Sequence, residues 1–129
     1  MGASACGSRG TSNDLLGTNL RWLVWGVPTV LLAAGFLLDG ARPWLWTPAF
    51  VVAGTACLAN ASRCRRLHCF ITGPLFLLCA VATLLTASGL VVLAPRWIGV
   101  TAVGGTAFGY SVEWVRGKYV ASGPARPVE

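Results

Sequence analysis

Four long apolar runs, separated by short polar segments, constrain this chain more than any other feature of its sequence. They cover residues 22–38, 44–61, 72–93 and 97–115. A helix needs about 20 apolar residues, and no fewer than roughly 17, to cross the ~30 Å hydrocarbon core of a bilayer. Each run meets that limit. The sequence therefore predicts an all-α, polytopic membrane protein with four transmembrane helices in a domain of residues 20–116.

The composition agrees with this prediction. Only 11% of the residues are charged and 55% are hydrophobic, with a mean hydropathy of +0.67. Soluble domains carry about 25% charged residues, so this surface is not built to face water. The net charge of +6 comes from basic residues scattered between the apolar runs. We interpret them as membrane-orienting charges, with the lipid bilayer rather than nucleic acid as the partner.

Positive charges predict the orientation. Four spans place the N-terminal tail (1–19), the segment 62–71 and the C-terminal tail (117–129) on one side. That side holds eight basic residues against two on the other: Arg9, Arg21, Arg63, Arg65, Arg66, Arg116, Lys118 and Arg126, against Arg42 and Arg96. The positive-inside rule then makes both termini cytoplasmic, in a multi-pass protein of the inner membrane. We expect the first tail to be disordered.

Tryptophans near the ends of the runs support the same layout, because indole rings favour the membrane interface. We interpret five of them as interfacial anchors: Trp22, Trp44, Trp46, Trp97 and Trp114. A signal peptide is the alternative interpretation of the first run. The length of that run and the turn-like segment 39–43 favour an uncleaved helix instead.

Small residues recur every four positions in the later runs. The sets are Ala49, Ala53, Cys57 and Ala61; Cys79, Thr83 and Ala87; and Gly105 with Gly109, extended by Thr101. Small side chains at this spacing let membrane helices approach closely. They predict packing faces, for helices of this chain, for a homo-oligomer or for a larger membrane partner. On this basis Cys57 and Cys79 are first of all packing residues.

The candidate chemistry lies in residues 60–74, NASRCRRLHCFITGP. Cys64, Cys69 and His68, the only histidine, fall within six residues of an otherwise apolar chain. We expect residues 62–71 to form a cytoplasmic loop, with a new helix starting near Thr72-Gly73-Pro74. A reducing cytoplasm predicts free thiols here. Neighbouring arginines favour the thiolate form.

Thiolates with an imidazole select soft or borderline metal ions, such as Hg, Cu, Zn or Cd. On a continuous helix, Cys64 and Cys69 would lie ~140° apart around the axis and ~7.5 Å along it, too far apart to share an ion. Chelation by both cysteines therefore requires a non-helical loop, whereas Cys64 and His68 could pair on a helix. A purely structural loop, with arginines on lipid headgroups, is the alternative.

A cysteine pair between the second and third spans of a small membrane protein resembles the mercuric-ion transporters of bacterial resistance operons. The resemblance covers the span layout and the loop. It implies that Cys64 and Cys69 receive a metal ion on the cytoplasmic side. Those transporters also carry a cysteine pair in their first span, where residues 22–38 have none. Cys57 and Cys79 are the possible relay residues within the membrane.

Three hypotheses on function follow. The first is binding or transport of a soft heavy-metal ion by Cys64, Cys69 and His68. The second is a non-catalytic membrane subunit or scaffold, and the third a membrane thiol oxidoreductase. No nucleotide-binding or hydrolase motif is visible. Glu113 in the fourth run is either a functional intramembrane carboxylate or half of an interfacial ion pair with Arg116.

Overall fold

The computed structural model describes residues 19–117 and residue 120, and within them it contains only helices and their connections. A π-helical turn, η1 (Trp22–Gly26), leads into α2 (Val27–Leu37). A short 3-10 turn, η2 (Asp39–Ala41), connects to α3 (Arg42–Cys64), which is followed by α4 (Leu67–Ala87) and α5 (Pro95–Arg116). The prediction of an all-α chain with four long helices is confirmed. The predicted tails, 1–19 and 117–129, lie almost wholly outside the described residues.

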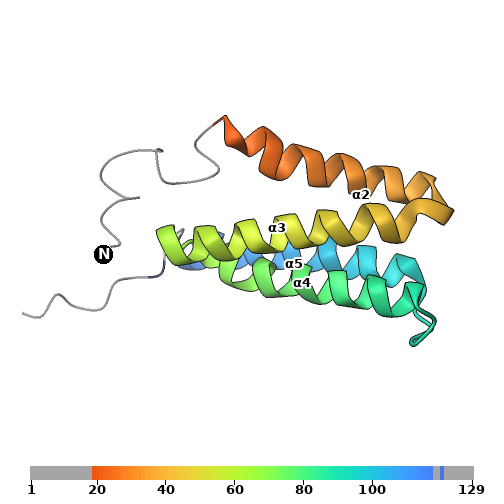
Figure 1. Ribbon diagram of the computed structural model, residues 1–129. Helices are drawn as coiled ribbons and strands as arrows, with labels where there is room; N and C mark the ends of the chain where they lie inside the picture. Colours follow the sequence, from red (N-terminus) through yellow and green to blue (C-terminus); the bar gives the residue numbers. More distant parts are fainter. Residues whose placement is uncertain (1–18, 118–119, 121–129) are drawn as a thin grey trace, which may run out of the picture.

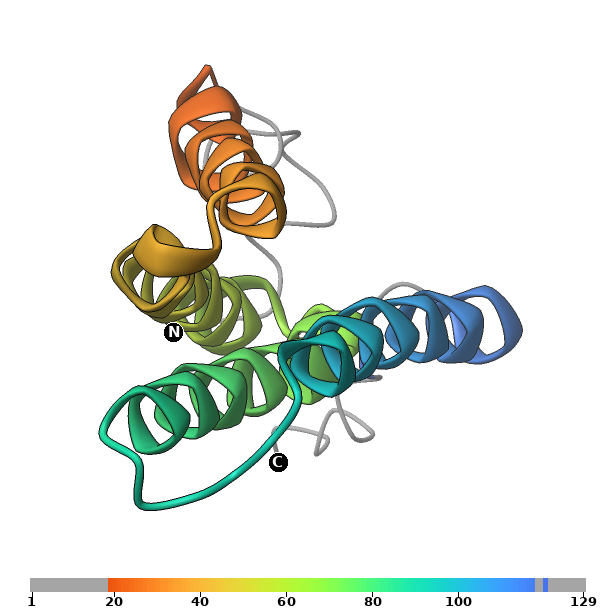
Figure 2. The same ribbon diagram turned by 90° about the vertical axis from the view of Figure 1, so that its right-hand side faces the viewer.

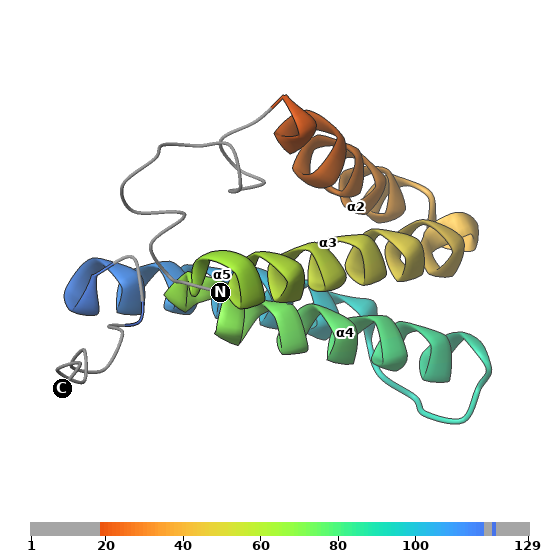
Figure 3. The same ribbon diagram turned by 60° about the vertical axis from the view of Figure 1, so that its left-hand side comes forward.

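Successive helices run in opposite directions and pack in sequence order, α2 on α3, α3 on α4, and α4 on α5 (Figure 1). The view along the helices in Figure 2 shows that α2 and α5 flank the α3–α4 pair without packing along each other. Figure 3 shows that α2 diverges from α3 toward its N-terminal end. Helix α2 therefore packs on α3, and its backbone does not closely approach that of α5.

Proline and glycine fix the helix ends. Pro43 and Pro95 occupy the first turns of α3 and α5, where a missing N–H costs nothing. Ala94 before Pro95 is extended, as the proline ring requires. After α4, Gly89 adopts a φ of 75°, and its N–H donates to the Thr86 carbonyl at 3.2 Å. This left-handed ending is typical of glycine after a helix.

The expected loop at 62–71 is shorter in the structure, and the third helix is placed differently. Residues 62–64 belong to α3 and residues 67–71 to α4, so the break comprises Arg65, at φ 51°, and the extended Arg66. Pro74 lies inside α4 rather than at its start, and α4 ends at Ala87 rather than at 93. A proline within a helix deprives the carbonyl four residues earlier, here that of Phe70, of its partner.

The core is built around Trp46, whose side chain is 1% exposed. Its indole N–H donates to the Leu32 carbonyl at 2.9 Å, and its ring covers Gly35 of α2. Edge-to-face contacts join Trp46 to Phe36 at 4.9 Å and to Phe50 at 6.0 Å between ring centroids. The prediction that Trp46 is an interfacial anchor was wrong. Trp44, two residues earlier, is 82% exposed, as an interfacial anchor would be.

The predicted small-residue faces pack within the chain for most of their length, but the prediction was wrong for Ala87 and Thr101, which are exposed. Ala49, Ala53, Cys57 and Ala61 of α3 are all buried. A side chain at Gly105 would collide with Leu75 of α4, and one at Gly109 would come within 3.3 Å of Thr72. Close approach through small residues is therefore confirmed. The partner of the Gly105–Gly109 face is α4 of the same chain.

Two of the helical segments, Asp39–Cys64 and Leu67–Ala87, are long and apolar enough to cross a membrane. Trp22–Leu37 is apolar but shorter. The same criteria also admit the buried core helix of a soluble protein. By length and composition, two helices of the described residues are able to cross a membrane.

Candidate functional site

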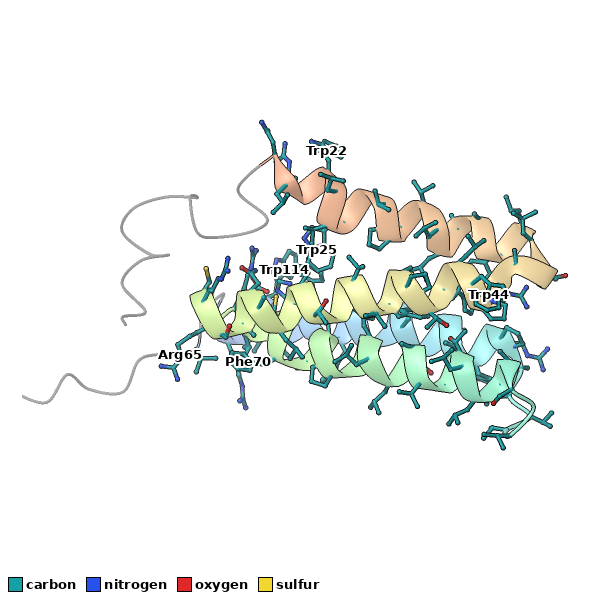
Figure 4. The ribbon with its side chains drawn as sticks, in the orientation of Figure 1. Trp22, Trp25, Trp44, Arg65, Phe70 and Trp114 are labelled. Carbon is teal, nitrogen blue, oxygen red and sulfur yellow. The ribbon has the colours of Figure 1, made fainter. Side chains whose placement is uncertain are left out.

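A buried polar cluster lies where α3 ends and α4 begins, near the arginine-rich end of the bundle. It combines two residues of α3, three of α4 and one of α5: Cys57 and Asn60; His68, Cys69 and Thr72; and Glu113. All six are less than 6% exposed. Figure 4 shows that the labelled Arg65, Phe70 and Trp114 lie at this end of the bundle and Trp44 at the opposite end. The cluster therefore gathers nearly all the buried polar side chains of the described residues in one place.

Glu113 joins α5 to α4 in this cluster. Its carboxylate forms an ion pair with the Arg66 guanidinium at 3.4 Å and contacts the His68 imidazole. The expected interfacial pair with Arg116 was wrong, because Glu113 faces α4 while Arg116 is exposed. A carboxylate buried in a helix interface is costly unless it is paired and hydrogen-bonded, and Arg66 and His68 provide both.

The contacts of His68 determine the direction of its hydrogen bonds. Nδ1 faces the Glu113 carboxylate, which accepts, so the proton of a neutral ring resides on Nδ1. Nε2 is then an acceptor, and it lies 3.3 Å from the sulfur of Cys69. Tyr110 of α5 stacks on the imidazole with a centroid distance of 4.4 Å. The ring is thus held on both nitrogens and on one face.

Two free thiols meet beside His68. Cys69 is 0% exposed, as is Cys57, and the two thiols come from facing positions of α4 and α3. The Thr72 hydroxyl donates to the sulfur of Cys57 at 3.3 Å. The amide of Asn60 donates to the sulfur of Cys69 at 3.8 Å. The two sulfurs are therefore shielded from solvent, and each accepts a hydrogen bond from a polar side chain of the α3–α4 interface.

The structure brings some of the predicted site residues together and places the others elsewhere. His68 and Cys69 are brought together with Cys57, which sequence reasoning assigned to packing or to a relay. Cys64 is buried at the end of α3 and is disulfide-bonded. The prediction of free thiols was therefore wrong for Cys64 and is confirmed for Cys69. Cys79 is a buried free thiol, but it lies ten residues along α4 from Cys69, or about 15 Å. Cys79 is therefore not part of the buried polar cluster.

A cavity of about 190 Å³ adjoins the cluster on the side of α2 and α5. His68 and Thr72 form part of its wall, with Trp25 and Leu32 from the first helical segment and Tyr110 from α5. His68 therefore stands between this cavity and the thiol pair.

The described residues contain no group of three or more His, Cys, Asp or Glu side chains arranged to hold a metal ion. What they contain is a pair of buried thiols on facing helices, with one imidazole beside it. Such an arrangement can bind an ion that accepts two sulfur ligands, or it can exchange between dithiol and disulfide.

The roles of Asn60, Tyr110 and Thr72 were not predicted. A signal for Asn60 was present, because Cys57, Asn60, Ala61 and Cys64 share one face of α3 at helical spacing. An asparagine on an otherwise small and apolar face indicates a polar partner on the opposing helix.

Comparison of the chain with known protein families, with curated proteins and with solved structures found no match.

Proposed function

We propose that this protein is a small multi-pass protein of the inner membrane that binds a soft metal ion as its cargo between Cys57 and Cys69. The observation that carries the proposal is the placement of two buried free thiols on facing helices. Thr72, which lies three residues after Cys69 on α4, donates to the sulfur of Cys57 at 3.3 Å. Soft thiolate ligands select soft ions. Because the fold already holds the two sulfurs close together, an ion bound to one of them meets the second at a high effective concentration.

The membrane part of the proposal is supported by the outer surface of the helices. Large apolar side chains face outward along the bundle, among them Leu37, Val103 and Trp114. The described arginines are also unequally divided. One end of the bundle carries Arg21, Arg63, Arg65, Arg66 and Arg116, and the other carries Arg42 and Arg96. The positive-inside rule favours a cytoplasmic arginine-rich end. The disulfide of Cys64 at the same end argues against a reducing compartment there.

The ligand set favours particular ions. Structural zinc sites use four ligands in a tetrahedron, which this cluster does not offer. Hg(II) and Cu(I) accept two thiolates, so they are the expected cargo ahead of Zn(II) and Cd(II). His68 is the nearest additional donor, since its Nε2 lies 3.3 Å from the sulfur of Cys69. The resemblance to mercuric-ion transporters agrees with this cargo, with Cys57 in place of Cys64 as the partner of Cys69.

The proposal is tested by titrating the purified protein in detergent with Hg(II), Cu(I), Zn(II) and Cd(II). Losing either thiol should weaken binding nearly as much as losing both, because one remaining thiolate retains no chelate. Cys79→Ser is the matched control, since Cys79 is also a buried free thiol of α4 but lies away from the pair. Binding should weaken as the pH falls, because protons compete for the sulfurs. Equal affinity in wild type and the Cys57→Ser/Cys69→Ser variant would rule the site out.

A second candidate function, thiol–disulfide exchange, is favoured by the order Glu113–His68–Cys69. A base held by a carboxylate and placed beside a thiol is the usual arrangement for activating a sulfur nucleophile. Oxidation would form a Cys57–Cys69 disulfide, releasing two protons and passing two electrons to the disulfide of another molecule. Incubation with oxidised glutathione, followed by alkylation and mass measurement, separates the two candidates. A reversible loss of both thiols in a protein that binds no metal would favour exchange.

If neither metal binding nor thiol exchange is detected, the membrane-subunit hypothesis takes their place. In that case Cys57 and Cys69 would be small packing residues in the α3–α4 interface.

A further inference from the structure

A groove runs between the first helical segment and α5, at the arginine-rich end of the bundle. Its outer part has a volume of about 770 Å³ and is lined by Arg21, Trp22, Trp25, Gly26, Thr29, Val30 and Tyr110. Its inner part is the cavity of about 190 Å³ beside His68. Trp25, Thr29 and Tyr110 line both parts, so the two parts adjoin each other. We call this space the α2–α5 groove.

The walls of the groove are mostly apolar, with two hydrogen-bond donors for which the described residues provide no acceptor. Arg21, which lies over the Trp22 ring at 5.4 Å, has no carboxylate partner among the described residues. The indole N–H of Trp25 is buried without a hydrogen-bond acceptor. A buried donor of this kind costs free energy until an acceptor reaches it. The groove therefore offers a positive mouth and an unsatisfied donor one turn below it.

The length of the groove fits one leaflet of a bilayer. From Arg21 at its mouth to Leu32 at its inner end the helix advances about 16 Å, at ~1.5 Å per residue. Half of a ~30 Å hydrocarbon core is ~15 Å. A ligand with its charge at Arg21 would thus reach Leu32 and the neighbouring Pro28 and Phe76 with a single acyl chain.

Charge selects the kind of headgroup. Glu113 is the carboxylate that the described residues place at this end, and it is already paired with Arg66 and His68. The remaining field at the mouth is positive, as expected for an anionic lipid. We propose that the α2–α5 groove binds one anionic phospholipid, with its phosphate on Arg21, an ester carbonyl within reach of the Trp25 indole and an acyl chain between α2 and α5. This rests on the membrane location proposed above and is independent of the thiol pair.

The test is native mass spectrometry of the detergent-purified protein, titrated with phosphatidylglycerol and phosphatidylcholine of equal chain length. Wild type should bind the anionic lipid more tightly. Arg21→Gln should lower that affinity about fivefold, since one arginine near a membrane surface contributes ~1 kcal/mol and 1.4 kcal/mol is tenfold. Arg96→Gln is the matched control, because Arg96 lies over the Trp97 ring at 5.9 Å but lines no part of the groove.

A second pair of variants tests the groove itself. Gly26 lines the outer part, and a side chain there would meet only Trp22, at 3.9 Å. Gly26→Leu should therefore fill the groove and abolish the lipid adduct. Gly104→Leu should leave it intact, because a side chain at Gly104 meets nothing within 4 Å and lies outside the groove.

Equal affinities for the two lipids, or equal losses in Arg21→Gln and Arg96→Gln, would overturn the proposal. So would a Gly26→Leu variant that retains the lipid. If Gly26→Leu instead changed the oligomeric mass and left lipid affinity unaltered, the groove would belong to a second copy of the chain. Cys57→Ser should bind the lipid normally, so failure of metal binding and failure of lipid binding are distinguishable.

Discussion

Glu113 near the end of α5 contacts His68 in the first turn of α4, although 45 positions separate the two residues in the chain. The same carboxylate reaches Arg66 at 3.4 Å, in the break between α3 and α4. The contact fixes the imidazole with one nitrogen toward Glu113 and the other toward the sulfur of Cys69. The position of the thiol pair therefore depends on the docking of α5 as well as on α3 and α4.

Replacing Glu113 should be strongly destabilising. Glu113→Ala would remove the carboxylate acceptor of the buried His68 and the ion pair with Arg66, and removing one partner of a buried ion pair costs about 3–5 kcal/mol. Unfolding in a mixed-detergent titration measures the loss. Arg116→Ala is the control, since an exposed substitution should change the free energy of unfolding by less than ~0.5 kcal/mol. Equal stabilities of the two variants would mean that the Glu113 pair contributes nothing.

A second prediction concerns two adjacent glycines of α5. A side chain at Gly105 would collide with Leu75 of α4, whereas one at Gly104 meets nothing within 4 Å. Gly105→Leu should therefore lower the free energy of unfolding by about 1–3 kcal/mol through overpacking. Gly104→Leu should leave it nearly unchanged. If both variants have the stability of wild type, α5 does not pack on α4 through this face.

The proposed topology predicts the side on which reporter fusions fold. A fusion at Glu129 should report the cytoplasm, and a fusion within residues 89–95 should report the opposite side, because α5 lies between them. Alkaline phosphatase and a fluorescent protein, active on opposite sides, provide the measurement. Both fusions reporting the same side would contradict the four-span arrangement.

The helices could be predicted because apolar run length and the prolines at positions 43 and 95 act locally. The extent of the break between α3 and α4 could not. Arginine and leucine are good helix formers, so a drop in hydropathy at residues 62–71 did not mean a loss of helix. The chain leaves the helix where Arg65 turns to a left-handed conformation, at φ 51°. Nothing in the residue types around it marked that position.

Only part of the candidate site could be predicted, because the rest depends on how the helices pack. Cys69 and His68 were identified from their rarity in an apolar chain, which is a property of composition. Their partners, Cys57 and Glu113, are determined by the register of α3 on α4 and by the docking of α5. Register depends on how Gly54 and Gly73 let the two helices approach, with Leu77 and Leu58 closing on them. The spacing of the cysteines in the sequence does not predict this helix–helix register.

X-ray absorption spectroscopy of the Hg(II)-loaded protein reports directly whether Cys57 and Cys69 together hold the ion. The account predicts a first coordination shell of two sulfurs in wild type and in the Cys79→Ser and Cys64→Ser variants. Cys57→Ser and Cys69→Ser should each lose one sulfur from that shell. A two-sulfur shell that survives in Cys57→Ser but is lost in Cys64→Ser would contradict the account and assign the ion to the cysteine pair expected from the sequence.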